Sequence, residues 1–176
     1  VQVTAAIAAT ALFGLAYAGA DLATRFQSGI MLVLIAALGS FFIGAGQTMD
    51  GPTLESAWTN PESDFEFWVV FAIFFPAVTG FTQGVSMSGD LKNPAKSLPI
   101  GTFLAVGIST IVYIVAMIVL AASLSLTDLR SDYDSLKRIA AVPWIIDAGV
   151  LAATLSSALA SFLGAPRILQ ALANDR

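Results

Sequence analysis

Five long apolar stretches alternate with polar segments along this 176-residue chain. The stretches are residues 1–20, 29–46, 67–87, 100–123 and 144–164. Each approaches the roughly 20 apolar residues that a helix needs to cross a bilayer. They predict an all-α transmembrane fold with five spans in a single membrane domain. The fourth stretch is uninterrupted and is most simply a lipid-facing or scaffold-facing helix.

The composition agrees with a membrane protein and narrows the function. Hydrophobic residues make up 57% of the chain and charged residues 11%, far from the usual soluble balance of roughly 25% charged. The net charge of -4 argues against a nucleic-acid partner. Histidine and cysteine are absent, so no credible catalytic base, nucleophile pair or metal cage can be assembled. We therefore expect neither an enzyme nor a cofactor.

The ends of the chain suggest a piece of a longer protein. It opens at Val1 inside an apolar run, without an initiator methionine, a basic segment or a cleavage site. It stops at Arg176, just past an apolar stretch. We expect its partners to be the lipid bilayer, the remaining spans of the parent protein and small ions. A homodimer is an open alternative.

The third apolar stretch is interrupted between residues 76 and 84. Pro76 lacks the N–H that would bond to the carbonyl of Ala72, and Gly80 and Gly84 weaken the helix preference further. Within a bilayer, such a break persists only where it is buried in protein or lines a wet cavity. The alternative is a proline-kinked helix that binds no ligand.

The two sides of this break suit ions of opposite charge. Carbonyls near Pro76 lack helical partners, and with the hydroxyl of Thr79 they provide oxygens for an alkali cation that loses its hydration shell. Free N–H groups at Gly80, Phe81 and Thr82 would begin the second half-helix. Such a terminus attracts an anion.

A second set of polar groups lies in the last apolar stretch, which reads ATLSS from Ala153 to Ser157. Small hydroxyls at this depth most often bond to their own helix or to a neighbouring one. Adjacent serines with carbonyls nearby are also what an all-oxygen sodium site needs. We expect the hydroxyls of Thr154, Ser156 and Ser157 to face the break around Thr79.

Asp147 is the only carboxylate within a predicted span. It lies in the first turn of that helix, where the helix dipole favours a negative charge and water is close. An interfacial role is favoured over a functional one, although an ionisable residue in a membrane always raises the question of function.

The distribution of Lys and Arg predicts the orientation in the membrane. One side carries Arg25, Lys92, Lys96, Arg167 and Arg176, and the other carries Arg130, Lys137 and Arg138. The more basic side faces the cytoplasm by the positive-inside rule. We expect loops 21–28 and 88–99 and the C-terminus to be cytoplasmic, and the acidic loop 47–66 to face outward.

Two motifs carry a family resemblance. FFPAVTG, followed by SGDLKNPAKSLPIGT, is similar to the discontinuous sixth span and following loop of the cation-chloride cotransporters, a branch of the amino acid, polyamine and organocation transporter superfamily. LAATLSSALASFLGAPRILQAL resembles the eighth span of that family. The resemblance implies spans four to eight of a leucine-transporter-type inverted-repeat fold with one discontinuous helix.

The resemblance also implies a function. The parent would be a symporter that moves chloride with sodium, and potassium as an open alternative, by alternating access in a bacterial or archaeal plasma membrane. The implied ligands are Pro76 and Thr79 for potassium, the backbone of Gly80, Phe81 and Thr82 for chloride, and Ala153, Ser156 and Ser157 for sodium. The paired serines favour the sodium-dependent branch.

The chain departs from the family pattern just after the proline motif. The family usually has two aliphatic residues after the glycine and then Ala-Gly, whereas this chain has Phe81, Thr82, Gln83 and Gly84. An amino acid permease of the same superfamily is therefore a second candidate, in which the half-helix N-terminus would hold a substrate carboxylate. A candidate of another class is a channel-like or scaffolding membrane protein whose break is only a kink.

Overall fold

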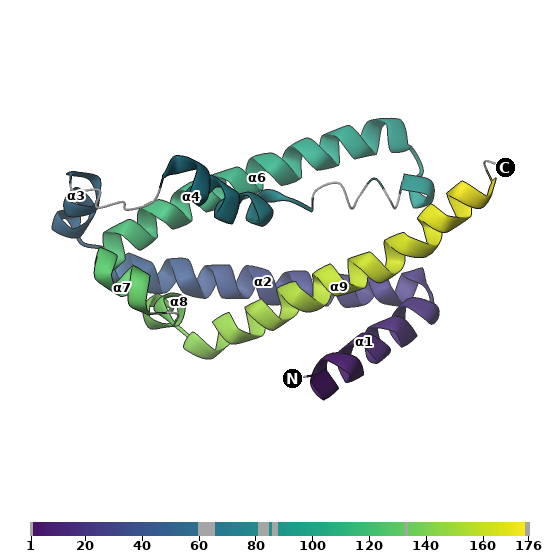
Figure 1. The fold of residues 1–176 in the computed structure, drawn as a ribbon, viewed down its shortest axis with the longest axis horizontal. Coiled ribbons are helices and arrows are strands. Elements are labelled where there is room, and N and C mark those ends of the chain that lie inside the picture. The colour runs from purple at the N-terminus through teal and green to yellow at the C-terminus, as the bar shows by residue number, and fades with distance from the viewer. Residues whose placement is uncertain (1, 60–65, 81–84, 86–87, 133, 175–176) are drawn as a thin grey trace.

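The computed structural model describes residues 2–59, 66–80, 85, 88–132 and 134–174, and its described elements are all helical (Figure 1). The α-helices are α1 (Gln2–Tyr17), α2 (Ala20–Thr48), α3 (Gly51–Thr59), α4 (Phe67–Phe74), α6 (Pro94–Ser123), α7 (Leu126–Ser131), α8 (Ser135–Ile139) and α9 (Pro143–Asn174). Two short 3₁₀ helices are η1 (Phe75–Val78) and η2 (Ser88–Asp90). The expected all-α fold is confirmed.

Three of these helices are long and apolar enough to cross a membrane. They cover Leu22–Thr48, Pro94–Ser123 and Pro143–Asn174. The apolar helices Gln2–Tyr17 and Phe67–Val78 are shorter. The described residues therefore contain three candidate spans, together with two apolar helices that are too short to meet the same length criterion.

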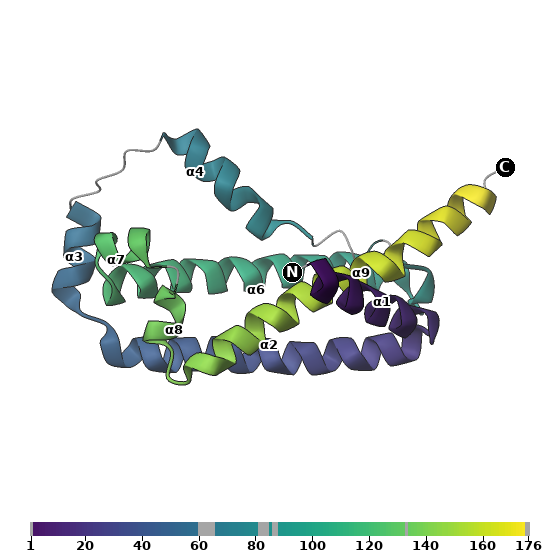
Figure 2. The same ribbon diagram turned by 60° about the horizontal axis from the view of Figure 1, so that its bottom comes forward.

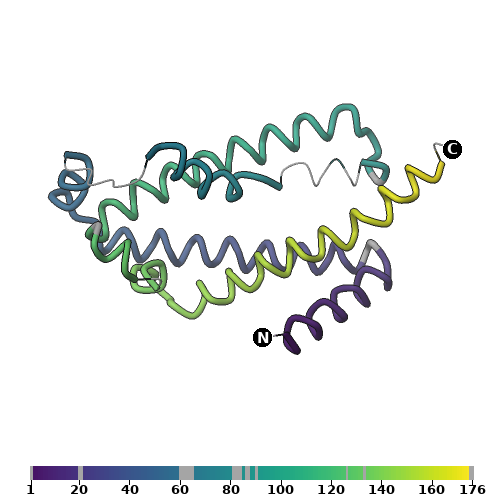
Figure 3. The backbone as a smooth tube through the Cα atoms, viewed as in Figure 1, coloured from purple at the N-terminus to yellow at the C-terminus, as the bar shows by residue number. Residues whose placement is uncertain are grey.

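The long helices α2 and α6 run in the same direction, and α9 runs in the opposite one, as Figures 1 and 2 show. The N–H of Asp50 donates to the carbonyl of Ala122 at 2.8 Å, which joins the C-terminal ends of α2 and α6. Ser40 and Val142 pair near one end of α2, and Gln27 and Ser156 pair nearer the other, so α2 and α9 are antiparallel. The tube in Figure 3 shows α1 beside α9 at the opposite end from α7 and α8.

The helix bounds differ from the apolar stretches at several ends. Residues 21–28, expected as a loop, belong to α2, which follows a tight turn at Gly19 with a φ of 125°. α6 begins at Pro94, a proline at the start of a helix where its missing N–H costs nothing. α9 continues through Pro166 to Asn174. Bilayer thickness limits the apolar length of a span, whereas the helix itself can extend into the polar region.

The acidic segment expected as a loop is also partly helical. Gly51–Thr59 forms α3, and its first residues are held by the bond between Asp50 and Ala122. The hydroxyl of Thr53 donates to the Asp50 carboxylate at 3.1 Å, close to the start of the helix. Residues 60–65 of the same segment lie outside the described residues.

A seven-residue repeat of mostly small residues forms the face of α2 that meets α9. Ala23, Ile30, Ala37 and Gly44 recur at this spacing, and all four are buried. Small residues let membrane helices approach closely. Close packing matters because burying apolar surface does not drive association of helices within lipid. The approach is closest at Gly149 of α9, where an added Cβ would lie 2.6 Å from the Cβ of Ala37.

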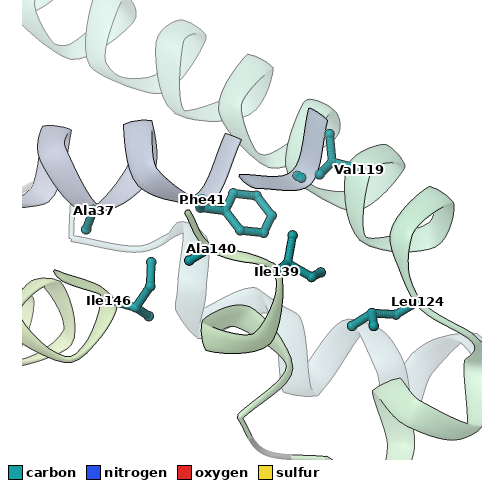
Figure 4. Close-up of a cluster of buried hydrophobic side chains, with 8 residues drawn as sticks. Ala37, Phe41, Val119, Leu124, Ile139, Ala140 and Ile146 are labelled. Atoms are coloured by element: carbon teal, nitrogen blue, oxygen red, sulfur yellow. The ribbon is translucent and has the colours of Figure 1, made fainter. Parts of the chain in front are cut away.

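The main buried cluster lies where α2, α6, α8 and the start of α9 meet (Figure 4). Its labelled members are Ala37, Phe41, Val119, Leu124, Ile139, Ala140 and Ile146. Ser40 fixes the segment before α9 against α2, because its hydroxyl accepts from the N–H of Val142 at 2.9 Å and its carbonyl accepts from Ala141 at 2.9 Å. This junction holds α2 and α9 in register.

The contact at Gly44 gives a stability prediction. A Cβ at this position would clash with backbone atoms of Ile139, Ala140 and Ala141, and backbone cannot move aside as a side chain can. We expect Gly44→Ala to destabilise the protein by about 1–3 kcal/mol, the usual cost of overpacking. The measurement is SDS-induced unfolding in mixed micelles, followed by circular dichroism.

Gly39→Ala is the matched control on the same helix. An added Cβ at Gly39 meets nothing within 4 Å, so this change should leave stability unaltered or raise it by up to about 1 kcal/mol through helix propensity. Equal unfolding midpoints for the two variants would show that the packing at Gly44 is not as close as the structure has it.

Candidate ion-binding site

The helix is broken where the sequence predicts. α4 ends when the N–H of Phe75 bonds to the carbonyl of Phe71, and the chain continues as the 3₁₀ helix η1. Thr79 is extended, with φ −88° and ψ 177°. Gly80 then has a φ of 96°, in the left-handed region that favours glycine. The chain therefore leaves the helix axis between Phe75 and Gly80.

The length of the segment before the break sets its depth. α4 has 8 residues and η1 has 4, and the two helices together extend about 20 Å along their axis. The hydrocarbon core of a bilayer is about 30 Å thick. A helix of this length that began at one surface and ran along the bilayer normal would end inside the bilayer, beyond its midplane.

Thr79 satisfies one of the carbonyls of the broken turn. Its hydroxyl donates to the carbonyl of Pro76 at 2.7 Å, and its N–H donates to the same oxygen at 3.3 Å. The two residues predicted as cation ligands are thus in direct contact. The Thr79 oxygen retains lone pairs after it donates, and a carbonyl oxygen has two.

A cavity of about 170 Å³ adjoins this turn, between η1 and α6. Its walls are Ala77, Val78, Thr79, Ala105, Val106, Ser109, Thr110 and Tyr113. The hydroxyl of Tyr113 donates to the carbonyl of Ala77 at 2.7 Å. Our sequence reading treated α6 as a lipid-facing or scaffold-facing helix. The signal it missed is the set of hydroxyls at positions 109, 110 and 113, which recur on one helical face.

The residues predicted to bind an anion are only partly described. Gly80 is placed at the end of the break. Phe81 and Thr82, with the neighbouring Gln83 and Gly84, lie outside the described residues. The prediction of an anion site there stays a prediction.

The sodium-site residues share one side of α9. Ala153, Ser156 and Ser157 are spaced at i, i+3 and i+4, so they lie on adjacent turns of the helix. Ala153 and Ser157 are exposed, while Ser156 is half-buried and accepts a hydrogen bond from the side-chain amide of Gln27 on α2. Sequence reasoning missed Gln27, because nothing local links it to a residue 129 positions away.

The break and the sodium-site residues have different neighbours. Tyr113 of α6 contacts the break, whereas Ser156 contacts Gln27 of α2. The segment α4–η1 lies apart from α9 in both ribbon views. The expectation that the ATLSS hydroxyls face Thr79 is therefore wrong for this structure, because α2 occupies the side of α9 that carries Ser156.

A larger cavity of about 770 Å³ lies elsewhere, between α1 and the C-terminal half of α9. Its lining is mainly apolar and includes Phe13, Phe162 and Leu169. None of the predicted ion ligands lines it. We therefore place the candidate chemistry at the break and on α9.

Asp147 belongs to a network of ion pairs at one end of the helices. Lys137 lies 2.7 Å from the Asp147 carboxylate and 2.9 Å from that of Asp134. These bonds, that to Asp147 first, raise the pKa of Lys137 above its ordinary value. The Asp147 side chain is 55% exposed. Its partner and its exposure give it an interfacial role.

A second part of this network lies in α7. The hydroxyl of Ser125 donates to the Asp128 carboxylate at 2.7 Å, and Arg138 lies 3.2 Å from it. The Ser125 bond, followed by the Arg138 bond, lowers the pKa of Asp128 below its ordinary 3.8. Both groups stabilise the carboxylate form.

These features define a class of protein. An all-α chain with helices long enough to cross a membrane, and with an apolar helix that breaks beside a cavity walled partly by hydroxyl groups, has the architecture of a secondary transporter. The chain belongs to the amino acid permease family, which matches it over residues 1–176.

Comparisons with curated proteins agree with this assignment. Mouse solute carrier family 12 member 8 is 34% identical over 176 aligned residues, which cover 94% of this chain and 25% of the relative. Human solute carrier family 12 member 2 is 30% identical over 224 residues, with 99% of this chain and 18% of the relative covered. Zebrafish solute carrier family 12 member 9 is 41% identical over 110 residues, with 62% and 12% covered.

The relatives are transporters, so the prediction that the chain is not an enzyme is confirmed. The resemblance to the cation-chloride cotransporters within the amino acid permease superfamily is also confirmed. The chain spans a quarter or less of the length of these three relatives.

The contacts of Asp128 predict that the stability of the protein depends on pH. Because the pKa of Asp128 is lowered by folding, its contribution to stability is present above its ordinary value of 3.8 and is lost as the pH falls through the folded value. We expect Asp128→Asn to lower the melting temperature slightly at pH 7. The difference from the unmodified protein should shrink as the pH falls below about 3.8.

Thermal unfolding followed by circular dichroism across a pH series is the measurement. Glu55→Gln, in α3, is the control, because Glu55 is not a member of any of the described ion pairs. A difference between Asp128→Asn and the unmodified protein that stays constant down to acid pH would contradict the assigned cause.

Proposed function

We propose that this chain forms spans four to eight of a symporter of the sodium-dependent cation-chloride cotransporter branch. The transported ions are chloride and sodium, with potassium as a candidate third ion. The observation that carries the proposal is the break between Phe75 and Gly80, which ends an apolar helix and places carbonyl and hydroxyl oxygens beside a cavity. Alternating access then exposes this region to one side of the membrane at a time.

The cation ligands at the break are Pro76 and Thr79. Their mutual hydrogen bonds set the Pro76 carbonyl and the Thr79 hydroxyl within one turn, so both oxygens can serve one ion. Hydroxyl and carbonyl oxygens suit an alkali cation. Potassium is the candidate at this position because of the family relationship.

The sodium ligands are Ala153, through its carbonyl, and the hydroxyls of Ser156 and Ser157. Their i, i+3, i+4 spacing gathers three oxygens on one side of α9. The amide of Gln27 supports this arrangement, because its bond to Ser156 restricts the rotation of that hydroxyl. Sodium is a hard cation and takes oxygen ligands of this kind.

The chloride ligands are the backbone N–H groups of Gly80, Phe81 and Thr82. Support comes from Gly80, whose left-handed conformation redirects the backbone at the end of the break.

In the membrane, we place the segment 88–99 and the C-terminus on the cytoplasmic side of the plasma membrane, according to the distribution of Lys and Arg. Association into a homodimer is compatible with this arrangement.

An amino acid permease is the second candidate function. The family that matches the whole chain is described as amino acid permease, and Gln83 places an amide where the cotransporters usually have an aliphatic or small residue. In that function the N–H groups after the break would bind a substrate carboxylate. The same positive helix end serves either anion.

The sodium ligands give the decisive test. We expect Ser156→Ala combined with Ser157→Ala, in the full-length protein, to raise the half-saturating sodium concentration roughly 10- to 30-fold. The reason is the loss of two oxygen ligands, each worth about 1 kcal/mol. The measurement is uptake of radiolabelled chloride into proteoliposomes as a function of sodium.

Ser161→Ala is the matched control. Ser161 lies on the same helix, but its hydroxyl is bonded to the Ser157 carbonyl at 3.1 Å and is not a proposed ligand. Unchanged sodium dependence in the double variant would exclude the α9 site. Amino acid uptake that needs no chloride would support the permease instead.

A further inference from the structure

We infer that the hydroxyl face of α6, formed by Ser109, Thr110 and Tyr113, is the second wall of the cation site at the break, and that Tyr113 orients the Ala77 carbonyl toward the bound ion. The inference rests on the proposed function and extends it. It adds three residues that lie outside the two motifs that carry the family resemblance.

Tyr113 contacts both parts of the broken segment. Its ring packs edge-on against Phe74 at the end of α4, with the ring centroids 5.6 Å apart and the planes at 78°. Its hydroxyl reaches one turn further and donates to the Ala77 carbonyl in η1 at 2.7 Å. One side chain thus spans the point where the α-helix becomes a 3₁₀ helix, and it fixes a carbonyl of that turn.

The cavity between the two helices is the place where an ion would lie. Thr79 lines it from η1, and Ser109, Thr110 and Tyr113 line it from α6. The other lining residues are Ala77, Val78, Ala105 and Val106. None of these described lining residues carries a charge, so the cavity offers neutral oxygens within an apolar wall.

The direction of the hydrogen bonds in the cavity wall indicates the charge of the ligand that the cavity would bind. The hydroxyl hydrogen of Thr79 is donated to Pro76, that of Tyr113 to Ala77, and that of Thr110 to the carbonyl of Val106 at 2.8 Å. A hydroxyl that has donated its hydrogen has only lone pairs left to offer. Three of the four hydroxyl groups in the cavity wall are thus oriented to accept, which suits a cation better than an anion.

The absence of carboxylates among the described lining residues indicates a monovalent cation, because magnesium and calcium are usually bound through carboxylates. The volume of about 170 Å³ holds five or six waters at about 30 Å³ each. There is room for a cation together with some of its water. This suits a large alkali cation such as potassium, or rubidium as its probe.

Position in the membrane supports the same assignment. Ser109, Thr110 and Tyr113 lie in the interior of a candidate span of 30 residues. Polar side chains within membrane helices usually face protein or a water-filled cavity, where they find partners. Their place opposite the break explains why the apolar middle of this helix carries three hydroxyls on one face.

The test is Tyr113→Phe in the full-length protein. This change removes the hydroxyl and keeps the ring that packs against Phe74. We expect the half-saturating rubidium concentration for uptake into proteoliposomes to rise about five- to tenfold, since one oxygen interaction is lost. The half-saturating sodium concentration should not change, because the proposed sodium ligands lie on α9.

Thr110→Val is the second variant and removes a different oxygen from the same wall. Thr10→Val is its matched control, because the Thr10 hydroxyl also bonds to the carbonyl four residues back, that of Ala6, at 2.8 Å. Tyr17→Phe, on α1, is the control for Tyr113→Phe. Only the α6 variants should alter the response to rubidium.

The outcomes separate this inference from the function on which it rests. If the protein responds to rubidium and neither α6 variant alters that response, the inference is wrong and the proposed function stands. If Tyr113→Phe lowers the affinities for rubidium and for sodium equally and also lowers the melting temperature, Tyr113 only stabilises the fold. The inference is then overturned. If rubidium is not taken up and does not alter transport while sodium-driven chloride uptake persists, the proposed cation site at the break is wrong. The inference about α6 is then wrong as well.

Discussion

A backbone carbonyl that loses its helical donor at membrane depth has no water to replace it. The end of η1 at Val78 creates this situation for the carbonyls of Pro76 and Ala77, and hydroxyl groups resolve it. Thr79 donates to the carbonyl of Pro76, and Tyr113 donates to that of Ala77. Each hydroxyl keeps lone pairs after donating its hydrogen. The groups that stabilise the break therefore also line it with oxygen acceptors, so the proposed affinity for cations would have the same origin as the stability of the break.

The remaining helices provide a frame for that break. α2 and α9 pack through small residues, closest at Ala37 and Gly149, and Ser40 locks the segment before α9 onto α2. α6 joins this frame at one end through the bond between Asp50 and Ala122, and further along it contacts the broken segment. The break is thus held by α6, which is itself anchored to the closely packed pair.

The sequence predicted the break because its cause is local: Pro76 has no N–H, and Gly80 tolerates a left-handed backbone. The roles of Tyr113 and Gln27 depend on partners 36 and 129 residues away, so no local pattern could reveal them. Helix ends were missed for another reason. The length of an apolar stretch reflects the thickness of the hydrocarbon layer, whereas a helix can continue beyond that layer. α9 does so and continues through Pro166.

The depth of the break has an electrical consequence. If α4 begins at one surface of a hydrocarbon layer of about 30 Å, its length of about 20 Å with η1 would place a bound ion beyond the midplane. A lone cation that reached the proposed site from the side where α4 begins would then have crossed more than half of the transmembrane voltage. Moving one charge across the whole voltage changes its free energy by about 2.3 kcal/mol per 100 mV, so occupancy by a lone cation would follow the membrane potential. A cation and an anion bound together cancel that dependence. Pairing opposite ions at this depth would make loading insensitive to voltage.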